Sequence, residues 1–208
     1  MTEMIESISF FLSTPVGPIR ISGDALAIHE VHFLKPDELT SLQDEFAYLF
    51  ADEGSNWLMD KTGKVNQDDF DKLNAAIKTI NHKMEPAFNL LVECKNQLMA
   101  YFSGSVKRFD LPLSQQGTSF QTRVWDQLSV IRYGDTISYL ELAKRLGDPK
   151  VIRAAASANG KNHLAIIIPC HRVIGSSGEL VGYGGGMQRK KWLLEHEKKF
   201  THGVQTLF

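Results

Sequence analysis

The chain has 208 residues, of which 43% are hydrophobic and 23% charged, a composition typical of a soluble globular protein with one large or two small domains. It contains no run of about 18 apolar residues, so we expect no membrane-spanning helix. Two cysteines exclude a four-cysteine zinc site. Because the start lacks the basic stretch of a signal peptide, we expect reduced thiols in a cytoplasm.

The formal net charge of −1 conceals an uneven distribution. Residues 1–100 hold 8 Lys and Arg against 16 Asp and Glu, whereas residues 138–208 hold 11 against 5. A basic second half favours contact with a polyanion, although uneven solvated surface charge alone would produce the same pattern.

The first third of the chain predicts a small sheet followed by helices. Residues 7–33 alternate apolar and polar positions around turns, which indicates an antiparallel meander. Residues 34–82 are acidic and weakly periodic, which favours short helices and loops. Within them, residues 60–70 resemble a calcium-binding loop when Gly63 takes the invariant glycine position. Leu58 then replaces the first acidic ligand, so we favour an acidic loop before a helix over a calcium site.

Residues 86–103 have helical periodicity. The predicted apolar face comprises Phe88, Leu91, Val92, Leu98, Met99 and Phe102. Cys94 lies on the same face, which predicts a buried core thiol. Residues 109–117 form a proline-containing connector, so we place the domain boundary between residues 1–111 and 112–208.

The second part predicts three helices in close succession. Thr118 is the expected N-cap of the first, with Gln121 completing a capping box. Residues 138–147 and 151–160 are two short helices separated by a tight turn, the pattern of a helix-turn-helix. A plain helical hairpin is the alternative, but the small residues of the second helix permit close approach to DNA.

Cys170 and His171 follow the apolar run 166–169, which predicts a buried strand ending at Pro169. A histidine can accept a thiol proton and so generate a nucleophilic thiolate. Either Glu195 or Glu197 would orient the histidine. A buried cysteine beside a histidine is more often structural, so this pair alone does not decide the function.

Several motifs in order resemble the O6-alkylguanine-DNA alkyltransferases. They read FDLPLSQQGTSFQTRVWDQL (109–128), YGDTISYLELAKRLGDPK (133–150), IRAAASANGKN (152–162), PCHRV (169–173), IGSSGELVGYGGG (174–186) and KKWLLEHE (190–197). The resemblance is close over about residues 98–197 and loose over residues 7–33. His163 and Ala165 depart from it, because they stand where many family members have prolines.

The resemblance implies an α/β fold. Its N-terminal domain would carry a small antiparallel sheet and be ribonuclease H-like, and its mainly helical C-terminal domain would hold a winged helix-turn-helix. The implied reaction is the irreversible, single-turnover transfer of a methyl or larger alkyl group to Cys170. The donor would be O6 of guanine, or O4 of thymine, in double-stranded DNA. The protein would act as a monomer with no cofactor, no zinc and no membrane. It would work in the cytoplasm, on the nucleoid, or in the nucleus of a eukaryote.

The resemblance also implies roles for individual residues. Cys170 would be the acceptor, His171 the base acting through a water, Glu197 the group that orients His171, and Asn162 the residue that holds the preceding turn.

A second implied set meets the DNA. Arg153 would fill the space left by a flipped nucleotide, and Tyr139 would press on the rotated phosphate. The remaining implied DNA contacts are Ala154, Ser157 and Ser176, and the implied base pocket is formed by Val173, Tyr183 and Gly184.

Three other functions fit parts of the pattern. A non-catalytic sensor of alkylated DNA would lack the cysteine, which is present. A Cys-His hydrolase would need an oxyanion hole and would turn over repeatedly. A DNA-binding regulator that senses alkylation at Cys170 would need a dimerisation or activation segment, for which the sequence has no signal.

Overall fold

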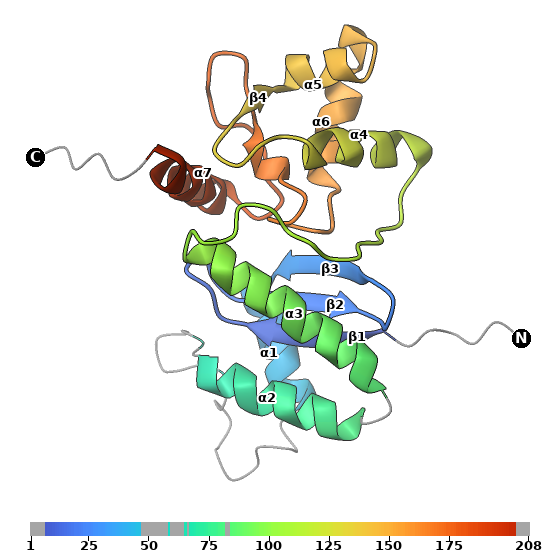
Figure 1. Cartoon of the computed structure of the whole chain (residues 1–208), viewed down its shortest axis with the longest axis vertical. Helices are drawn as coiled ribbons and strands as arrows, with labels where there is room; N and C mark the ends of the chain where they lie inside the picture. The colour runs from blue at the N-terminus through green and yellow to red at the C-terminus, as the bar shows by residue number, and fades with distance from the viewer. Residues whose placement is uncertain (1–6, 47–57, 59–64, 66, 82–83, 203–208) are drawn as a thin grey trace, which may run out of the picture. The chain divides into compact units, whose positions relative to one another are not determined.

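The structure is a computed structural model that describes residues 7–46, 58, 65, 67–81 and 84–202 (Figure 1). The chain divides into two compact units. Unit 1 comprises Met1–Met99 with Leu111–Ser114, and unit 2 comprises Ala100–Asp110 with Gln115–Phe208. The expected division of function between residues 1–111 and 112–208 stays a prediction.

Unit 1 is built on the three-stranded antiparallel sheet that the meander predicts. The strands are β1 (Ile8–Leu12), β2 (Ile19–Gly23) and β3 (Ile28–Phe33), in the order β1-β2-β3. Phe10 of β1 pairs with Ile21 of β2, which pairs with Val31 of β3. Because successive side chains of a strand point to opposite faces, the neighbours Phe10 and Phe11 enter two different layers.

Helices cover both faces of this sheet (Figure 1). Phe10 contacts Phe88 with ring centroids 5.6 Å apart, and Phe11 contacts Phe70 at 5.8 Å. On the second face, the Asn74 side chain donates to the Phe11 carbonyl (2.7 Å) and accepts from the Phe11 amide (2.8 Å), which fixes helix to strand. The helices are α1 (Pro36–Glu45), α2 (Gln67–Ile80) and α3 (Glu85–Phe102).

The buried face of α3 differs from the predicted one. Its buried residues are Ala87, Leu91, Cys94, Leu98 and Tyr101, a repeat of four and three residues that follows one side of the helix. The prediction for Met99 is wrong, because its side chain is 46% exposed. The true face includes a small alanine and a tyrosine, neither of which the apolar pattern singled out. The prediction of Cys94 as a buried thiol is confirmed.

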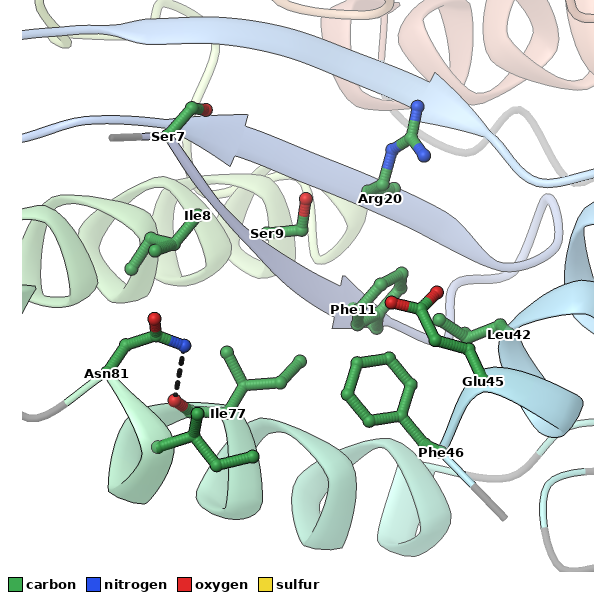
Figure 2. Close-up of a pocket in the computed structure, with 11 residues that line it drawn as sticks. Ser7, Ile8, Ser9, Phe11, Arg20, Leu42, Glu45, Phe46, Ile77 and Asn81 are labelled. Carbon is green, nitrogen blue, oxygen red and sulfur yellow. Dashed lines mark hydrogen bonds between the residues drawn. The ribbon is translucent and has the colours of Figure 1, made fainter. Parts of the chain in front are cut away.

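The acidic segment contains the helices α1 and α2, as expected. The calcium-loop alternative falls mainly on residues 59–64 and 66, which lie outside the described residues. A pocket of about 470 Å³ in unit 1 lies between the start of β1 and the ends of α1 and α2 (Figure 2). Phe11, Phe46 and Ile77 form its apolar wall, and Arg20 lines it from β2 while pairing with Glu30 at 2.9 Å.

Unit 2 is mainly helical and contains the predicted helix-turn-helix. Thr118 caps α4 in a capping box with Gln121, and Ser138 caps α5 by accepting from the Glu141 amide at 3.0 Å. Gly147 ends α5 in a left-handed conformation at φ 96°. The elements are α4 (Ser119–Ser129), β4 (Ile137–Ser138), α5 (Tyr139–Arg145), η4 (Pro149–Val151), α6 (Ile152–Gly160), η5 (Cys170–Arg172), β5 (Val173–Ile174) and α7 (Met187–His202).

The strand predicted at residues 166–169 is wrong. This segment forms turns instead, and Cys170 begins the short 3-10 helix η5. The Asn162 side-chain amide donates to the carbonyl of Ile168 (2.8 Å) and lies 3.3 Å from that of Leu164, so the chain folds around a side chain rather than along a neighbouring strand. Ile166 sits at φ 71°, a backbone strain for a β-branched residue that this enclosure sustains.

Candidate active site

The turn around Asn162 fixes the position of Cys170. The amide nitrogen Nδ2 of Asn162 lies 3.2 Å from Cys170 Sγ, and Asn159 Nδ2 of α6 donates to the Cys170 carbonyl at 3.3 Å. Cys170 is 6% exposed. Its sulfur therefore faces a hydrogen-bond donor and stays nearly closed to solvent.

His171 is held by Glu197 of α7. Its Nε2 atom lies 2.8 Å from Glu197 Oε1, and both side chains are fully buried. Since an ionised carboxylate only accepts hydrogen bonds, Nε2 carries the proton and Nδ1 keeps a free lone pair. Nδ1 has no hydrogen-bond partner among the described residues. Burial lowers the pKa of His171 despite the opposing effect of Glu197, so the ring rests in the neutral form that a base requires.

Glu197 gathers hydrogen bonds from four residues. Its Oε1 accepts from Tyr101 Oη (2.8 Å), His171 Nε2 (2.8 Å) and Arg172 Nη2 (3.0 Å). Its Oε2 accepts from Arg172 Nε (2.9 Å) and the Gly134 amide (3.0 Å). Burial alone would raise the pKa of Glu197, but the His171 hydrogen bond and the Arg172 charge outweigh it and hold the pKa well below the usual range. Glu197 thus stays ionised and orients His171 without taking a proton.

The thiol of Cys170 is not ionised at rest. Burial raises its pKa, and this effect outweighs the Asn162 hydrogen bond and the Lys190 charge, which lower it. A thiolate therefore has to be generated by transfer of the proton to a base. The His171 ring, next in sequence, is neutral and keeps Nδ1 without a hydrogen-bond partner among the described residues.

Lys190 fastens the glycine-rich segment behind the site. Its Nζ donates to the carbonyls of Val173 (2.6 Å) and Val181 (2.7 Å), and the side chain is fully buried. Burial lowers its pKa to about 8, while Cys170 acts in the opposite direction. The bond to Lys190 thus engages the backbone carbonyl of Val173, one of the three residues expected to form the base pocket.

A pocket of about 610 Å³ lies beside these groups, and its lining includes Asn159, the residue that holds the Cys170 carbonyl. Tyr139, the first residue of α5, lines it and donates to the Val181 carbonyl at 3.3 Å. Five of the predicted DNA and base contacts line this pocket: Tyr139, Arg153, Ser176, Tyr183 and Gly184. The other three do not line it: Ala154 and Ser157, which are exposed on α6, and the buried Val173.

Sequence reasoning missed three residues of the site. Arg172 and Tyr101 reach Glu197 from distant parts of the chain. Lys190 had a detectable signal, because it lies three residues before the buried Leu193 and seven before Glu197, on the same face of α7. The alternative partner Glu195 is excluded, since its side chain is 65% exposed and pairs loosely with Lys191.

Among the described residues, no group of three or more His, Cys, Asp or Glu side chains is arranged to hold a metal ion. None of the helices in the described ranges is long and apolar enough to cross a membrane.

Comparison with known proteins identifies the family to which the chain belongs. Residues 9–115 match the 6-O-methylguanine DNA methyltransferase ribonuclease-like domain, and residues 119–199 match the DNA binding domain of the same family. A methylated-DNA–protein-cysteine methyltransferase of Methanosarcina acetivorans is 36% identical over 88% of this chain and 94% of the relative. One from Mycobacterium bovis is 54% identical over 54% of this chain and 68% of the relative.

Two solved crystal structures are similar to this chain over most of its length. The crystal structure of Mycobacterium tuberculosis OGT in complex with DNA has a TM-score of 0.64 and 35% identity, covering 92% of this chain and 93% of that chain. The crystal structure of the Mycobacterium tuberculosis O6-methylguanine methyltransferase also has a TM-score of 0.64, with 33% identity over 98% of this chain and 99% of that chain. Both parts of this chain, the sheet-based unit and the helix-turn-helix unit, thus belong to the 6-O-methylguanine DNA methyltransferase family.

Proposed function

We propose that this protein repairs alkylated DNA by direct reversal, and that Cys170 is the residue that receives the alkyl group. Two contacts support the assignment: Asn162 Nδ2 lies 3.2 Å from Cys170 Sγ, and Nε2 of His171, the next residue, lies 2.8 Å from Glu197 Oε1. In this proposal, the buried thiol of Cys170 would use the neutral His171 as its base, and the ionised Glu197 would orient that base.

The reaction is a displacement at the alkyl carbon. His171 Nδ1 takes the Cys170 proton, directly or through one water, and the thiolate attacks the carbon attached to O6 of guanine. The carbon–sulfur bond forms as the carbon–oxygen bond breaks, and its electron pair leaves on the guanine. The guanine recovers a proton, so the products are S-alkylcysteine and an unmodified base.

Three further groups support this step. Asn162 Nδ2 and the Lys190 charge favour the thiolate over the thiol, and both lower the pKa of Cys170 against the effect of burial. The ionised Glu197 keeps Nε2 of His171 protonated, so that Nδ1 is the atom available to the thiol.

The target base has to leave the duplex to reach the thiol. O6 of guanine lies within the base stack, so the nucleotide would be flipped into the 610 Å³ pocket at a cost of a few kcal/mol. Arg153 is exposed on α6 and lines the pocket, and in this proposal it would fill the gap in the stack. The exposed Ala154 and Ser157 permit close approach of α6, and Ser176 at the rim would meet a phosphate.

The pocket walls would contact the flipped base. Tyr139 and Tyr183 offer aromatic rings, and Gly184 leaves room for the substituent. We expect binding to depend weakly on sequence and strongly on salt. O6-methylguanine is the expected lesion, with larger alkyl groups and O4-methylthymine as further substrates.

The site requires no cofactor, because the donor is the lesion itself. A thioether is stable to water at such a site, so each molecule acts once. We propose a monomer that works on double-stranded DNA in the cytoplasm of a bacterium, or in the nucleus of a eukaryote.

The test is transfer from a duplex that carries one O6-methylguanine, followed by intact and peptide mass spectrometry. We expect one methyl increment per molecule, on the peptide that holds Cys170. Cys170→Ala should gain none, whereas Cys94→Ala should behave as wild type. Lesion binding without any mass change would replace the proposal with a sensor, and repeated turnover would replace it with a hydrolase.

A further inference from the structure

We propose that Tyr101 is a positioning residue for alkyl transfer, acting through Glu197 on the base His171. The inference rests on the function proposed above. Tyr101 comes from the last turn of α3, far from the site in sequence, and its side chain is fully buried. Its hydroxyl donates to Glu197 Oε1 at 2.8 Å, the same oxygen that accepts from His171 Nε2 at 2.8 Å.

Tyr101 holds α7 at two consecutive residues. Besides the bond from its hydroxyl to Glu197, its carbonyl lies 2.9 Å from His196 Nε2. A carbonyl only accepts, so Nε2 of His196 donates. The His196 ring is itself fixed by stacking on Trp192 at 4.8 Å and 11°. These two contacts, one donated and one accepted by Tyr101, fix the rotation and the height of α7 where Glu197 projects.

The hydroxyl also tunes the charge that His171 meets. Oε1 of Glu197 shares its negative charge among three donors, those of Tyr101, His171 and Arg172. Burial and the Glu197 charge raise the pKa of Tyr101 well above its usual range, so the hydroxyl remains a donor. Without it, more of the carboxylate charge would act on His171 and would favour the protonated imidazolium, which cannot serve as a base.

A purely structural role is the alternative, because the Tyr101 ring packs against Phe109 and Tyr133 at 5.6 Å and 5.8 Å. The substitution Tyr101→Phe separates the two roles, since it keeps the ring and removes only the oxygen. Tyr133→Phe is the matched control. Its hydroxyl is also buried, but it has no hydrogen-bond partner among the described residues.

The experiment measures the single-turnover rate of methyl transfer from an O6-methylguanine duplex between about pH 5 and about pH 9, together with affinity for undamaged duplex. For Tyr101→Phe we expect transfer to slow about threefold to tenfold and the acid limb of the pH profile to move to higher pH. Affinity for DNA should not change. Tyr133→Phe should match wild type in transfer rate, in pH profile and in affinity for DNA.

A double-variant comparison tests the route through Glu197. In a Glu197→Gln background, Tyr101→Phe should cause no further slowing, because the carboxylate on which it acts is gone. Equal slowing in both backgrounds, or a Tyr101→Phe profile identical to wild type, would overturn the inference.

A second variant covers the case in which Tyr101→Phe does not fold. His196→Phe keeps an aromatic ring in the stack and removes the donor to the Tyr101 carbonyl, so we expect transfer to slow about twofold. An unchanged rate in this variant would count against the inference that Tyr101 fixes α7 through both of its hydrogen bonds. Failure of wild type to transfer methyl would instead reject the proposed function, which keeps the two outcomes distinct.

Discussion

The surroundings of Cys94 and Cys170 show what turns a buried thiol into a reactive one. Both cysteines are free and nearly closed to solvent, and burial raises the pKa of each, that of Cys94 to about 12. Cys94 lies in the apolar face of α3, where the neighbouring charge of Glu93 raises its pKa further. Cys170 instead meets the Asn162 amide and the Lys190 charge, and both act in the opposite direction. Burial is common to the two sites, and only the polar partners differ.

Replacing the sulfur of each cysteine by oxygen is the strongest test of the difference between Cys94 and Cys170. Cys170→Ser should slow methyl transfer by about 10³-fold or more, because a hydroxyl ionises far less readily than a thiol. Cys94→Ser should leave the transfer rate unchanged and lower only the free energy of unfolding. Rates come from radiolabelled or mass-detected transfer, with stability from denaturant titration. Transfer by the Cys170 variant at the wild-type rate would contradict the assignment.

Removing the charge of Glu197 tests the partners on the reactive side. Glu197→Gln should slow transfer by about 10²-fold, since His171 loses the group that fixes its tautomer. It should also lower the free energy of unfolding by about 3–5 kcal/mol, because the Arg172 guanidinium is left buried without its counterion.

The matched control for this variant is Glu195→Gln. Glu195 is on the same helix but is 65% exposed, so neither the rate nor the stability should change. Similar slowing in both variants would point to a general effect of charge on DNA binding.

Two asparagines, buried Asn74 in unit 1 and half-buried Asn162 in unit 2, allow the two units to be compared directly. Asn162→Ala should slow transfer by about tenfold and lower the free energy of unfolding by about 1–3 kcal/mol, because it frees backbone carbonyls as well as Cys170 Sγ. Asn74→Ala should cause a similar loss of stability through the contacts of Asn74 with Phe11, with no effect on the rate. If Asn74→Ala slowed transfer as much as Asn162→Ala, the loss of rate would follow from lost stability and not from a contact with Cys170.

The smallest expected effect is on the pH dependence of stability. The folded chain keeps His171 neutral, whereas the unfolded chain protonates it near its ordinary pKa of 6.5. The unfolded state then binds more protons, so the free energy of unfolding should fall as the pH drops below 6.5.

Denaturant titrations at a series of pH values would measure this fall, with His171→Gln as the control that should flatten it. Cys94 cannot contribute, because its thiol stays protonated throughout that range. If the free energy of unfolding of the His171 variant fell equally steeply with decreasing pH, other titratable groups would cause the fall.

Local patterns in the sequence predicted the local structure well. The meander, the capping box of Thr118 and the helix-turn-helix all depend on residues close together in the chain, where spacing and capping chemistry decide the outcome. Cys170, His171 and Glu197 were singled out by chemistry and resemblance, and the structure brings His171 and Glu197 into contact.

The failures share a physical cause. The apolar run 166–169 has the composition of a strand, but the Asn162 side chain supplies the hydrogen bonds that a neighbouring strand would have given. Tyr101 and Arg172 became visible only through tertiary contacts with Glu197. The face of α3 was misassigned at Met99 because apolar composition alone does not indicate which side of a helix meets the core.

The saturation of Glu197 restricts how this protein can change over evolutionary time. Each of its oxygens already has donors, and within the described part of the chain Glu197 is the one carboxylate that Arg172 contacts. A neutral residue at either position strands a charge in the interior, so single substitutions pass through a poorly folded intermediate. Positions 172 and 197 are therefore expected to vary together or not at all across descendants of this sequence, while exposed neighbours such as Glu195 drift freely.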